Sequence, residues 1–177
     1  KALKEFKSIH AGKWVWRNKR EQTSFVKQYL AIRKYKKAIL QGPPGWGKTH
    51  QMFKLDRAFW LRHGGITVNF SDSVLTLKQN FEHYMEQYKA HEISRPALVI
   101  CRGADDENMT DWPVKVYGRN DEPKIAKWLK NNPNGIVFCF YGNTPGLENA
   151  AKAKGIEFTF AAFDEASRTC QPIGSGW

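Results

Sequence analysis

Eight consecutive residues have the types and the spacing of a phosphate-binding loop. The run Gly42-Pro43-Pro44-Gly45-Trp46-Gly47-Lys48-Thr49 fits the pattern G-x-x-x-x-G-K-[ST] at every fixed position. Its glycines let the backbone turn with the N–H groups facing inward, where they bind phosphate oxygens together with the N-terminus of a following helix. Lys48 is expected to reach the β- and γ-phosphates, and the Thr49 hydroxyl to bind Mg²⁺. We therefore predict that all eight residues bind the phosphates of a nucleotide.

Two adjacent carboxylates supply the second half of such a site. Asp164 and Glu165 follow the apolar run 158–163, which is expected to be a strand. Ligands of open α/β sheets bind at the carboxyl ends of the strands. We expect Asp164 to hold Mg²⁺, directly or through water, and Glu165 to orient and deprotonate the attacking water. Lys48, Asp164 and Glu165 are thus the predicted catalytic residues. The alternatives without function are a Gly-Pro turn that happens to contain a lysine, for the first motif, and a solvated acidic turn, for the second.

The elements that must position these residues alternate between helix and strand. Apolar spacing and turn residues predict helices over 19–32, 49–61, 74–88, 123–129 and 147–154, and strands over 37–41, 66–70, 96–101, 135–141 and 158–163. Ser73 or a neighbour is expected to cap the third of these helices, and the glycine pair 64–65 to end the second. The acidic segment 103–123 is expected to be a loop. Apolar strands alternating with helices predict an α/β fold with a mainly parallel sheet covered by helices on both faces.

The basic residues are distributed unevenly along the chain. The 177 residues carry 28 Lys and Arg against 17 Asp and Glu, a formal net charge of +11. Residues 1–62 hold 16 of the basic residues and 3 of the acidic ones. This asymmetry indicates a polyanionic partner such as nucleic acid, or else a solvated basic face on an ordinary enzyme. Residues 1–36 are predicted to be a basic N-terminal segment, and residues 37–177 to form the ATPase lobe.

Composition excludes several classes of protein. Hydrophobic residues make up 41% of the chain, enough for a core, which excludes a disordered tail. Cys101, Cys139 and Cys170 form no CxxC pair, so neither a zinc cluster nor a disulfide framework is predicted. No apolar run approaches the roughly 18 residues of a membrane span, and no signal-peptide pattern is present. We expect an intracellular, cytoplasmic protein, of which this chain is a fragment.

The segment Asp164-Glu165-Ala166-Ser167-Arg168-Thr169 resembles the D-E-A-H-R-T form of motif II in superfamily-2 helicases of the DEAD/DEAH type. Other segments match in order. Residues 68–73, followed by Leu77 and Gln79, are similar to motif Ia, and residues 136–143 are similar to the strand ending in T-Y-x-S. The segments 97–101, 111–114 and 125–129 resemble the restriction-type and phage branch. The resemblance covers about residues 17–170 and implies the first RecA-like lobe of the motor. Ser167 replaces the usual motif II His, which puts the coupling of hydrolysis to domain movement in doubt.

The resemblance also implies further contacts. Residues 17–22 occupy the place of an adenine-reading element, which makes Gln22 a candidate adenine contact or an ordinary exposed helix residue. Candidate nucleic-acid contacts, each with capping, packing or turning as its alternative role, are Ser73, Gln79, Tyr141, Gly142 and Asn143. ATP and Mg²⁺ are the implied cofactors, and nucleic acid is the implied partner, with DNA favoured over RNA.

Helicases of this kind close a second RecA-like lobe on the first, and that lobe supplies an arginine finger. The chain is predicted to contain only the first lobe, so alone it should bind nucleotide weakly and hydrolyse it slowly. Two other functions stay open: another P-loop ATPase, such as a phage DNA-packaging motor, and a basic nucleic-acid-binding module with a weak ATP site.

Overall fold

The computed structural model describes residues 19–36, 47–90, 94–101, 112–118 and 120–165 of the chain. Its residues fall into two compact units, Lys1–His63 and Gly64–Trp177, and each is a structure by itself. The predicted strand 37–41 and most of the predicted phosphate-binding loop lie outside the described residues. The predicted division of the chain after residue 36 stays a prediction.

Two helices make up the described part of the first unit. They are α2, Lys19–Tyr35, and α3, Lys48–His63. Tyr29 of α2 is buried, and its ring lies 5.4 Å from the ring of Phe59 in α3. Both helices agree with the sequence prediction within a few residues. The glycine pair after α3 has positive φ angles of 65° and 81°, which glycine adopts without strain, so the predicted helix end is confirmed.

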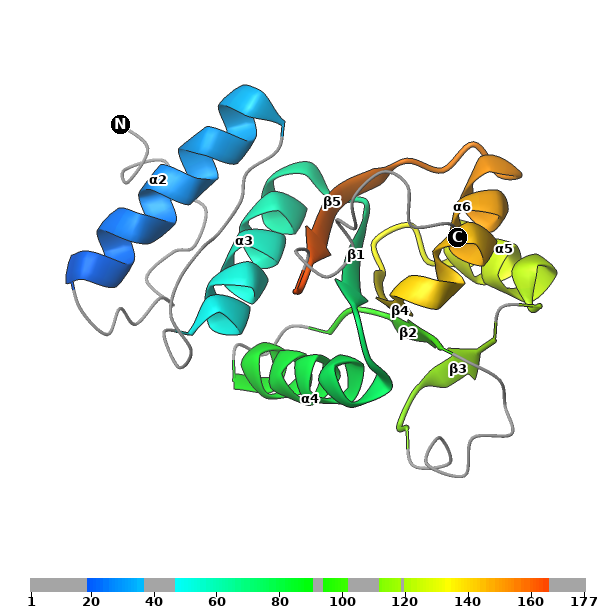
Figure 1. The fold of residues 1–177 in the computed structure, drawn as a ribbon. Helices are drawn as coiled ribbons and strands as arrows, with labels where there is room; N and C mark the ends of the chain where they lie inside the picture. Colours follow the sequence, from blue (N-terminus) through cyan, green and yellow to red (C-terminus); the bar gives the residue numbers. More distant parts are fainter. Residues whose placement is uncertain (1–18, 37–46, 91–93, 102–111, 119, 166–177) are drawn as a thin grey trace, which may run out of the picture. The chain divides into compact units, whose positions relative to one another are not determined.

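The second unit contains a parallel sheet of five strands. Along the chain its elements are β1 (Ile66–Ser71), α4 (Val74–Ala90), β2 (Ala97–Ile100), β3 (Lys115–Tyr117), α5 (Glu122–Asn131), β4 (Ile136–Phe140), η2 (Tyr141–Asn143), α6 (Thr144–Lys152) and β5 (Phe158–Phe163). The strand order is β3-β2-β4-β1-β5, with every pair parallel (Figure 1). The carboxyl ends of β1, β4 and β5 therefore meet at one edge of the sheet.

Helices cover both faces of this sheet, as the sequence predicts. On one face, apolar side chains of β1, β2 and β4 pack against α5 and α6 in a single buried cluster. On the other face α4 contributes an aromatic layer, in which Phe81 and Tyr84 lie 5.3 and 5.2 Å from the ring of Phe138 in β4. Such burial of apolar area supplies most of the free energy of folding.

Strand β1 departs from the expectation of uniformly apolar strands. All six of its residues are buried, yet they alternate between apolar and polar types. Ile66, Val68 and Phe70 belong to the cluster with α5 and α6, whereas Thr67 and Ser71 accept hydrogen bonds from residues outside the strand. A buried polar group costs little free energy only when it is hydrogen-bonded, so β1 requires specific partners on its polar face.

The expected loop over 103–123 is wrong in one place. Lys115–Tyr117 forms β3, which pairs with β2 from Leu98 to Ile100 at one end of the sheet. Three residues are too few to show the alternation that marks a strand in a sequence. Helix α6 also begins at Thr144, earlier than predicted, because the 3-10 turn η2 leads directly into it.

Candidate functional site

The acidic pair lies directly after β5, at the carboxyl edge of the sheet. The backbone N–H of Asp164 donates to the carbonyl oxygen of Phe70 at 2.9 Å, so pairing with β1 continues one residue beyond the strand. Glu165 follows with a φ of 53°, a left-handed conformation that is uncommon for a residue with a side chain. Its N–H donates to Oδ1 of Asp164 at 3.1 Å. The predicted position of both carboxylates at the end of a strand is therefore confirmed.

A buried amide holds the other oxygen of the Asp164 carboxylate. Nδ2 of Asn80, in α4, lies 3.0 Å from Oδ2 of Asp164. The same nitrogen lies 3.1 Å from Oγ of Ser71 and 3.5 Å from Oδ1 of Asn69, both in β1. Asn80 is only 3% exposed. These contacts connect α4, β1 and the residue after β5 at one point.

An aromatic cluster supports the backbone of the same turn. The Tyr141 hydroxyl, at the start of η2, donates to the carbonyl oxygen of Asp164 at 2.7 Å. The Phe70 ring stacks on the Phe163 ring at 4.7 Å, and the Tyr141 ring lies 6.2 and 6.3 Å from those two rings. The ends of β1, β4 and β5 are thus joined through both side chains and backbone around Asp164.

Three of the predicted nucleic-acid residues lie in η2, after β4. Tyr141 takes part in the aromatic cluster, and Gly142 is exposed. A Cβ at Gly142 would lie 2.6 Å from Cε1 of Phe140, so the turn accepts no larger residue without movement of that ring. Asn143 precedes α6 and is 1% exposed. The contact of these three residues with nucleic acid stays a prediction.

The other two predicted nucleic-acid residues lie on α4. The Ser73 hydroxyl accepts a hydrogen bond from the Thr76 N–H at 3.0 Å and lies 2.8 Å from the Thr76 hydroxyl. Ser73 is therefore the N-cap of α4, which confirms the capping prediction. Gln79 is exposed on the same helix, next to Asn80. Their contact with nucleic acid also stays a prediction.

The first unit shows the last part of the predicted phosphate-binding loop. Gly47 has a φ of 85°, and its carbonyl oxygen accepts from the Gln51 N–H at 3.0 Å as α3 begins. Lys48 and Thr49 are the first two residues of α3, so both lie at the positive end of a 16-residue helix. The start of a helix at this lysine agrees with the prediction. Residues 42–46 lie outside the described part of the chain.

Gln22 lies in α2, and its side chain is outside the described residues. Its predicted contact with adenine is untested. Lys48 and Thr49 belong to one unit, and Asp164 and Glu165 to the other.

The donor types fit a magnesium ion. Mg²⁺ takes one or two hydroxyl or carboxylate oxygens from a protein beside phosphate oxygens and water, and Thr49 and Asp164 each carry an oxygen of such a type. A site of this kind needs no large cluster of protein ligands. In the described ranges no group of three or more His, Cys, Asp or Glu residues could hold a metal ion.

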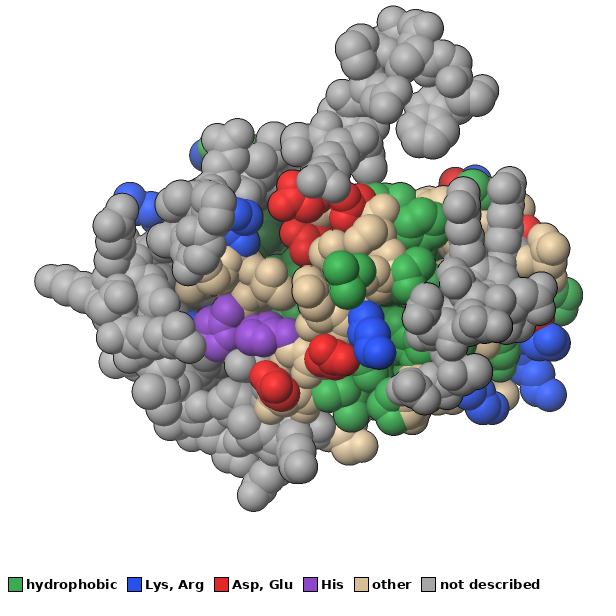
Figure 2. Space-filling view, turned by 60° about the horizontal axis from the view of Figure 1, so that its bottom comes forward, with side chains coloured by type: hydrophobic (Ala, Val, Ile, Leu, Met, Phe, Trp, Pro, Cys, Tyr) green, Lys and Arg blue, Asp and Glu red, His purple; other side chains and the backbone are tan. Residues whose placement is uncertain are grey.

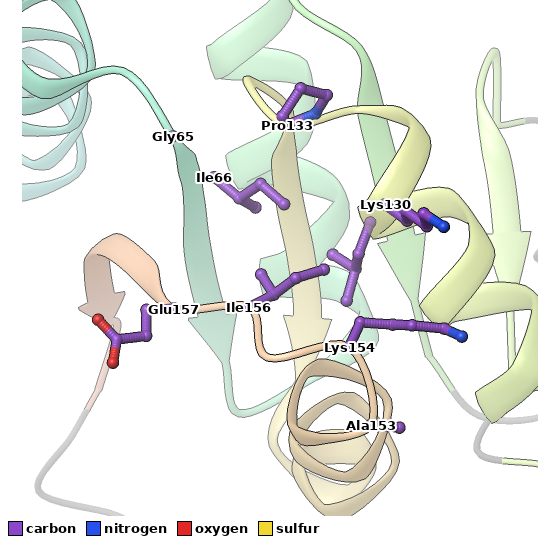
Figure 3. A pocket seen from close by; sticks show the side chains of 9 residues that line it. Gly65, Ile66, Lys130, Pro133, Ala153, Lys154, Ile156 and Glu157 are labelled. Carbon is purple, nitrogen blue, oxygen red and sulfur yellow. The ribbon is translucent and has the colours of Figure 1, made fainter.

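A shallow hollow of about 520 Å³ lies at the opposite, amino edge of the sheet. Figure 3 shows it beside the start of β1, with Ile66 and Ile156 on its floor and Lys130 and Lys154 along one side. None of its lining residues belongs to the predicted site. Because the strands point away from this edge, it does not share the acidic pair's surroundings.

Two groups of residues were missed by sequence reasoning. The first is Asn80, which donates to the Asp164 carboxylate, with Asn69 and Ser71 beside its nitrogen. The second is Arg95, which donates to Thr67, Tyr88, Asn134 and Gly135 near the amino edge. Polar residues at alternate positions of β1 could have indicated both groups, since buried polar residues in a strand require hydrogen-bond partners.

A similar fold occurs in a solved structure, that of a nuclease-deletion mutant of the Type ISP restriction-modification enzyme LlaGI in complex with a DNA substrate mimic. The TM-score is 0.65 and the sequence identity 18%, and the match covers 86% of this chain but only 15% of that one. At such identity the likeness shows the fold alone, and it confirms the predicted α/β, RecA-like fold with a parallel sheet. No known family model matches the chain, and no curated protein matches it.

Within the ranges that the structure describes, no helix combines the length and the apolar character needed to cross a bilayer.

Proposed function

We propose that the chain binds ATP with Mg²⁺ and hydrolyses it, as the first motor lobe of a superfamily-2 helicase or translocase that acts on nucleic acid. The observation that carries this proposal is the acidic pair. Its sequence resembles motif II, and Asp164 is held at the carboxyl edge by the β1 backbone, the Tyr141 hydroxyl and a buried amide. The phosphate-binding pattern ending in Lys48 and Thr49 at the start of α3 supports it.

Each residue has a defined role in this proposal. The backbone N–H groups of residues 42–49 and the Lys48 ammonium bind the phosphates, and Thr49 and Asp164 hold Mg²⁺, which neutralises charge on the phosphates. Glu165 accepts a hydrogen bond from the attacking water and takes its proton. In this proposal the two carboxylates serve different ligands, Asp164 the metal ion and Glu165 the water.

Nucleic acid is the proposed partner, with DNA favoured because the solved structure of similar fold was determined with a DNA substrate mimic. The proposed contacts are the turn before α4 and the η2 turn, which both lie at carboxyl ends of neighbouring strands. Binding would depend mainly on phosphates and so weaken with salt. A second RecA-like lobe would supply the arginine finger, and the isolated chain would hydrolyse ATP slowly.

The experiment measures ATP binding and hydrolysis by Lys48→Ala and Glu165→Gln variants. Lys48→Ala is expected to abolish hydrolysis, and Glu165→Gln to retain bound ATP while turnover falls. Lys130→Ala, which removes an exposed lysine at the opposite edge, is the control and should behave as the unsubstituted chain. Unchanged turnover in both site variants, measured also in the complete protein, would rule out the assignment.

A basic nucleic-acid-binding module is the second candidate, and the distribution of charge favours it. The whole excess of basic residues lies in residues 1–62, because residues 63–177 hold 12 basic and 14 acidic residues. On the face shown in Figure 2 the described Lys and Arg side chains are scattered, with acidic side chains among them. Salt-sensitive DNA binding without any ATP binding would support this function instead of a motor.

A further inference from the structure

We propose that Asn80 is a positioning residue for the Asp164 carboxylate, so that Asp164 is oriented for a Mg²⁺–nucleotide before either binds. The inference rests on the proposed function and adds a residue that neither motif contains. It arises from a contact between residues 84 positions apart in the sequence.

The orientation of the Asn80 amide follows from its partners. An ionised carboxylate only accepts hydrogen bonds, so the group 3.0 Å from Oδ2 of Asp164 must be the NH₂ of Asn80 and not its oxygen. The Ser71 hydroxyl at 3.1 Å and the Asn69 side-chain oxygen at 3.5 Å can both accept from the same nitrogen. The carboxylate therefore fixes the orientation of the amide, and the two N–H groups of Asn80 are shared among these three oxygens.

Burial gives this amide its effect. Asn80, Asn69 and Ser71 are 3%, 3% and 0% exposed, so water does not compete for their hydrogen bonds. Apolar residues at these three positions would pack α4 against β1 without needing hydrogen-bond partners. The polar set instead ends at Asp164, the only charged member.

The result is a carboxylate held at both oxygens. Oδ2 accepts from Asn80, and Oδ1 accepts from the N–H of Glu165 at 3.1 Å. Each carboxylate oxygen can accept more than one partner, so both remain able to face a cation. Residues that orient a metal ligand in this way commonly change metal affinity or activity by 10- to 100-fold when they are replaced.

The test compares nucleotide binding with and without metal. The affinity of the 177-residue chain for a fluorescent ATP analogue is measured in Mg²⁺ and in EDTA. For Asn80→Leu, which has a similar volume and no donor, we expect about a tenfold loss of affinity in Mg²⁺. Affinity in EDTA should stay within about twofold, because Asn80 acts only on the metal ligand.

Thr67→Val is the matched control. Thr67 is a buried polar residue of the same strand, but its hydroxyl accepts from Arg95 at the other end of β1. It should lower stability without changing the ratio of the two affinities. Circular dichroism confirms that each variant folds, and Asn80→Ser replaces Asn80→Leu if the larger side chain prevents folding.

The outcomes separate the two proposals. An unsubstituted chain that binds no nucleotide in either buffer overturns the proposed function. An unsubstituted chain that binds more tightly in Mg²⁺, with the Asn80 variant unchanged, overturns the positioning role alone. Equal losses in Mg²⁺ and EDTA would also overturn it, since they indicate a general structural effect.

Discussion

Replacing Arg95 by methionine removes a group of hydrogen bonds that joins several elements of the second unit. The guanidinium donates to the carbonyl oxygens of Asn134 at 3.0 Å and Gly135 at 2.7 Å. It also donates to the hydroxyl oxygens of Thr67 at 3.0 Å and Tyr88 at 3.1 Å. Arg95 is 7% exposed and thereby ties the amino ends of β1 and β4 to α4. Methionine keeps the length of the side chain and removes every donor.

The magnitude follows from what each acceptor does afterwards. A hydrogen bond from a charged donor contributes about 1.5–3 kcal/mol, so a simple sum would exceed about 6 kcal/mol. The loss is smaller because Gly135 O keeps the Thr67 N–H at 3.2 Å, and Asn134 is exposed, so its carbonyl can be hydrated. The two hydroxyls can rotate toward other acceptors. We therefore expect Arg95→Met to lower the free energy of unfolding by about 3–4 kcal/mol.

Urea unfolding at 25 °C, followed by circular dichroism, measures this free energy. Arg95→Lys is the informative companion, because an ammonium keeps the charge but cannot reproduce the planar set of donors. It should lower the free energy of unfolding by about 2 kcal/mol. A loss below about 1 kcal/mol for Arg95→Met, or a lysine variant as stable as the unsubstituted chain, would refute this reasoning.

Two further predictions concern the site and the core. Tyr141→Phe removes the hydrogen bond to the Asp164 carbonyl, which contributes about 0.5–1.5 kcal/mol. In a steady-state ATPase assay it should slow ATP hydrolysis about two- to tenfold, and in a DNA-binding titration it should leave the affinity for DNA unchanged. Unchanged hydrolysis with weaker DNA binding would make Tyr141 a nucleic-acid contact instead. Burial raises the pKa of the Cys139 thiol well above its usual range, and Cys101 is buried beside it, so a folded Cys170→Ser variant should not react with a thiol reagent at pH 8 until urea unfolds it. Rapid labelling of the folded variant would contradict that burial.

Local patterns predicted most of the fold correctly. Helix and strand order followed from apolar spacing and from turn residues, because each of the longer elements presents several residues of one pattern. Strand β3 was missed because a three-residue edge strand depends on its pairing with β2, which no local pattern contains. The α/β arrangement itself follows from apolar strands that alternate with helices.

The candidate site divides in the same way. The position of Asp164 and Glu165 after a strand was predictable, because motif and strand adjoin in the sequence. The contact of Asp164 with Asn80 was not, since it requires β5 to pair beside β1 and α4 to cover the polar face of β1. In the sequence, Thr67, Asn69 and Ser71 alternate with apolar residues. This alternation was the sign that the polar side chains of β1 have hydrogen-bond partners.

The proposed function requires Lys48 and Asp164 to act on one Mg²⁺–ATP molecule, and a double-mutant cycle tests this requirement directly. Affinity for a fluorescent ATP analogue in Mg²⁺ is measured for Lys48→Ala, Asp164→Asn and the double variant. Residues that bind one ligand together should show a coupling energy of about 1 kcal/mol or more. Losses that add within about 0.5 kcal/mol, or no loss in either single variant, would contradict a shared nucleotide.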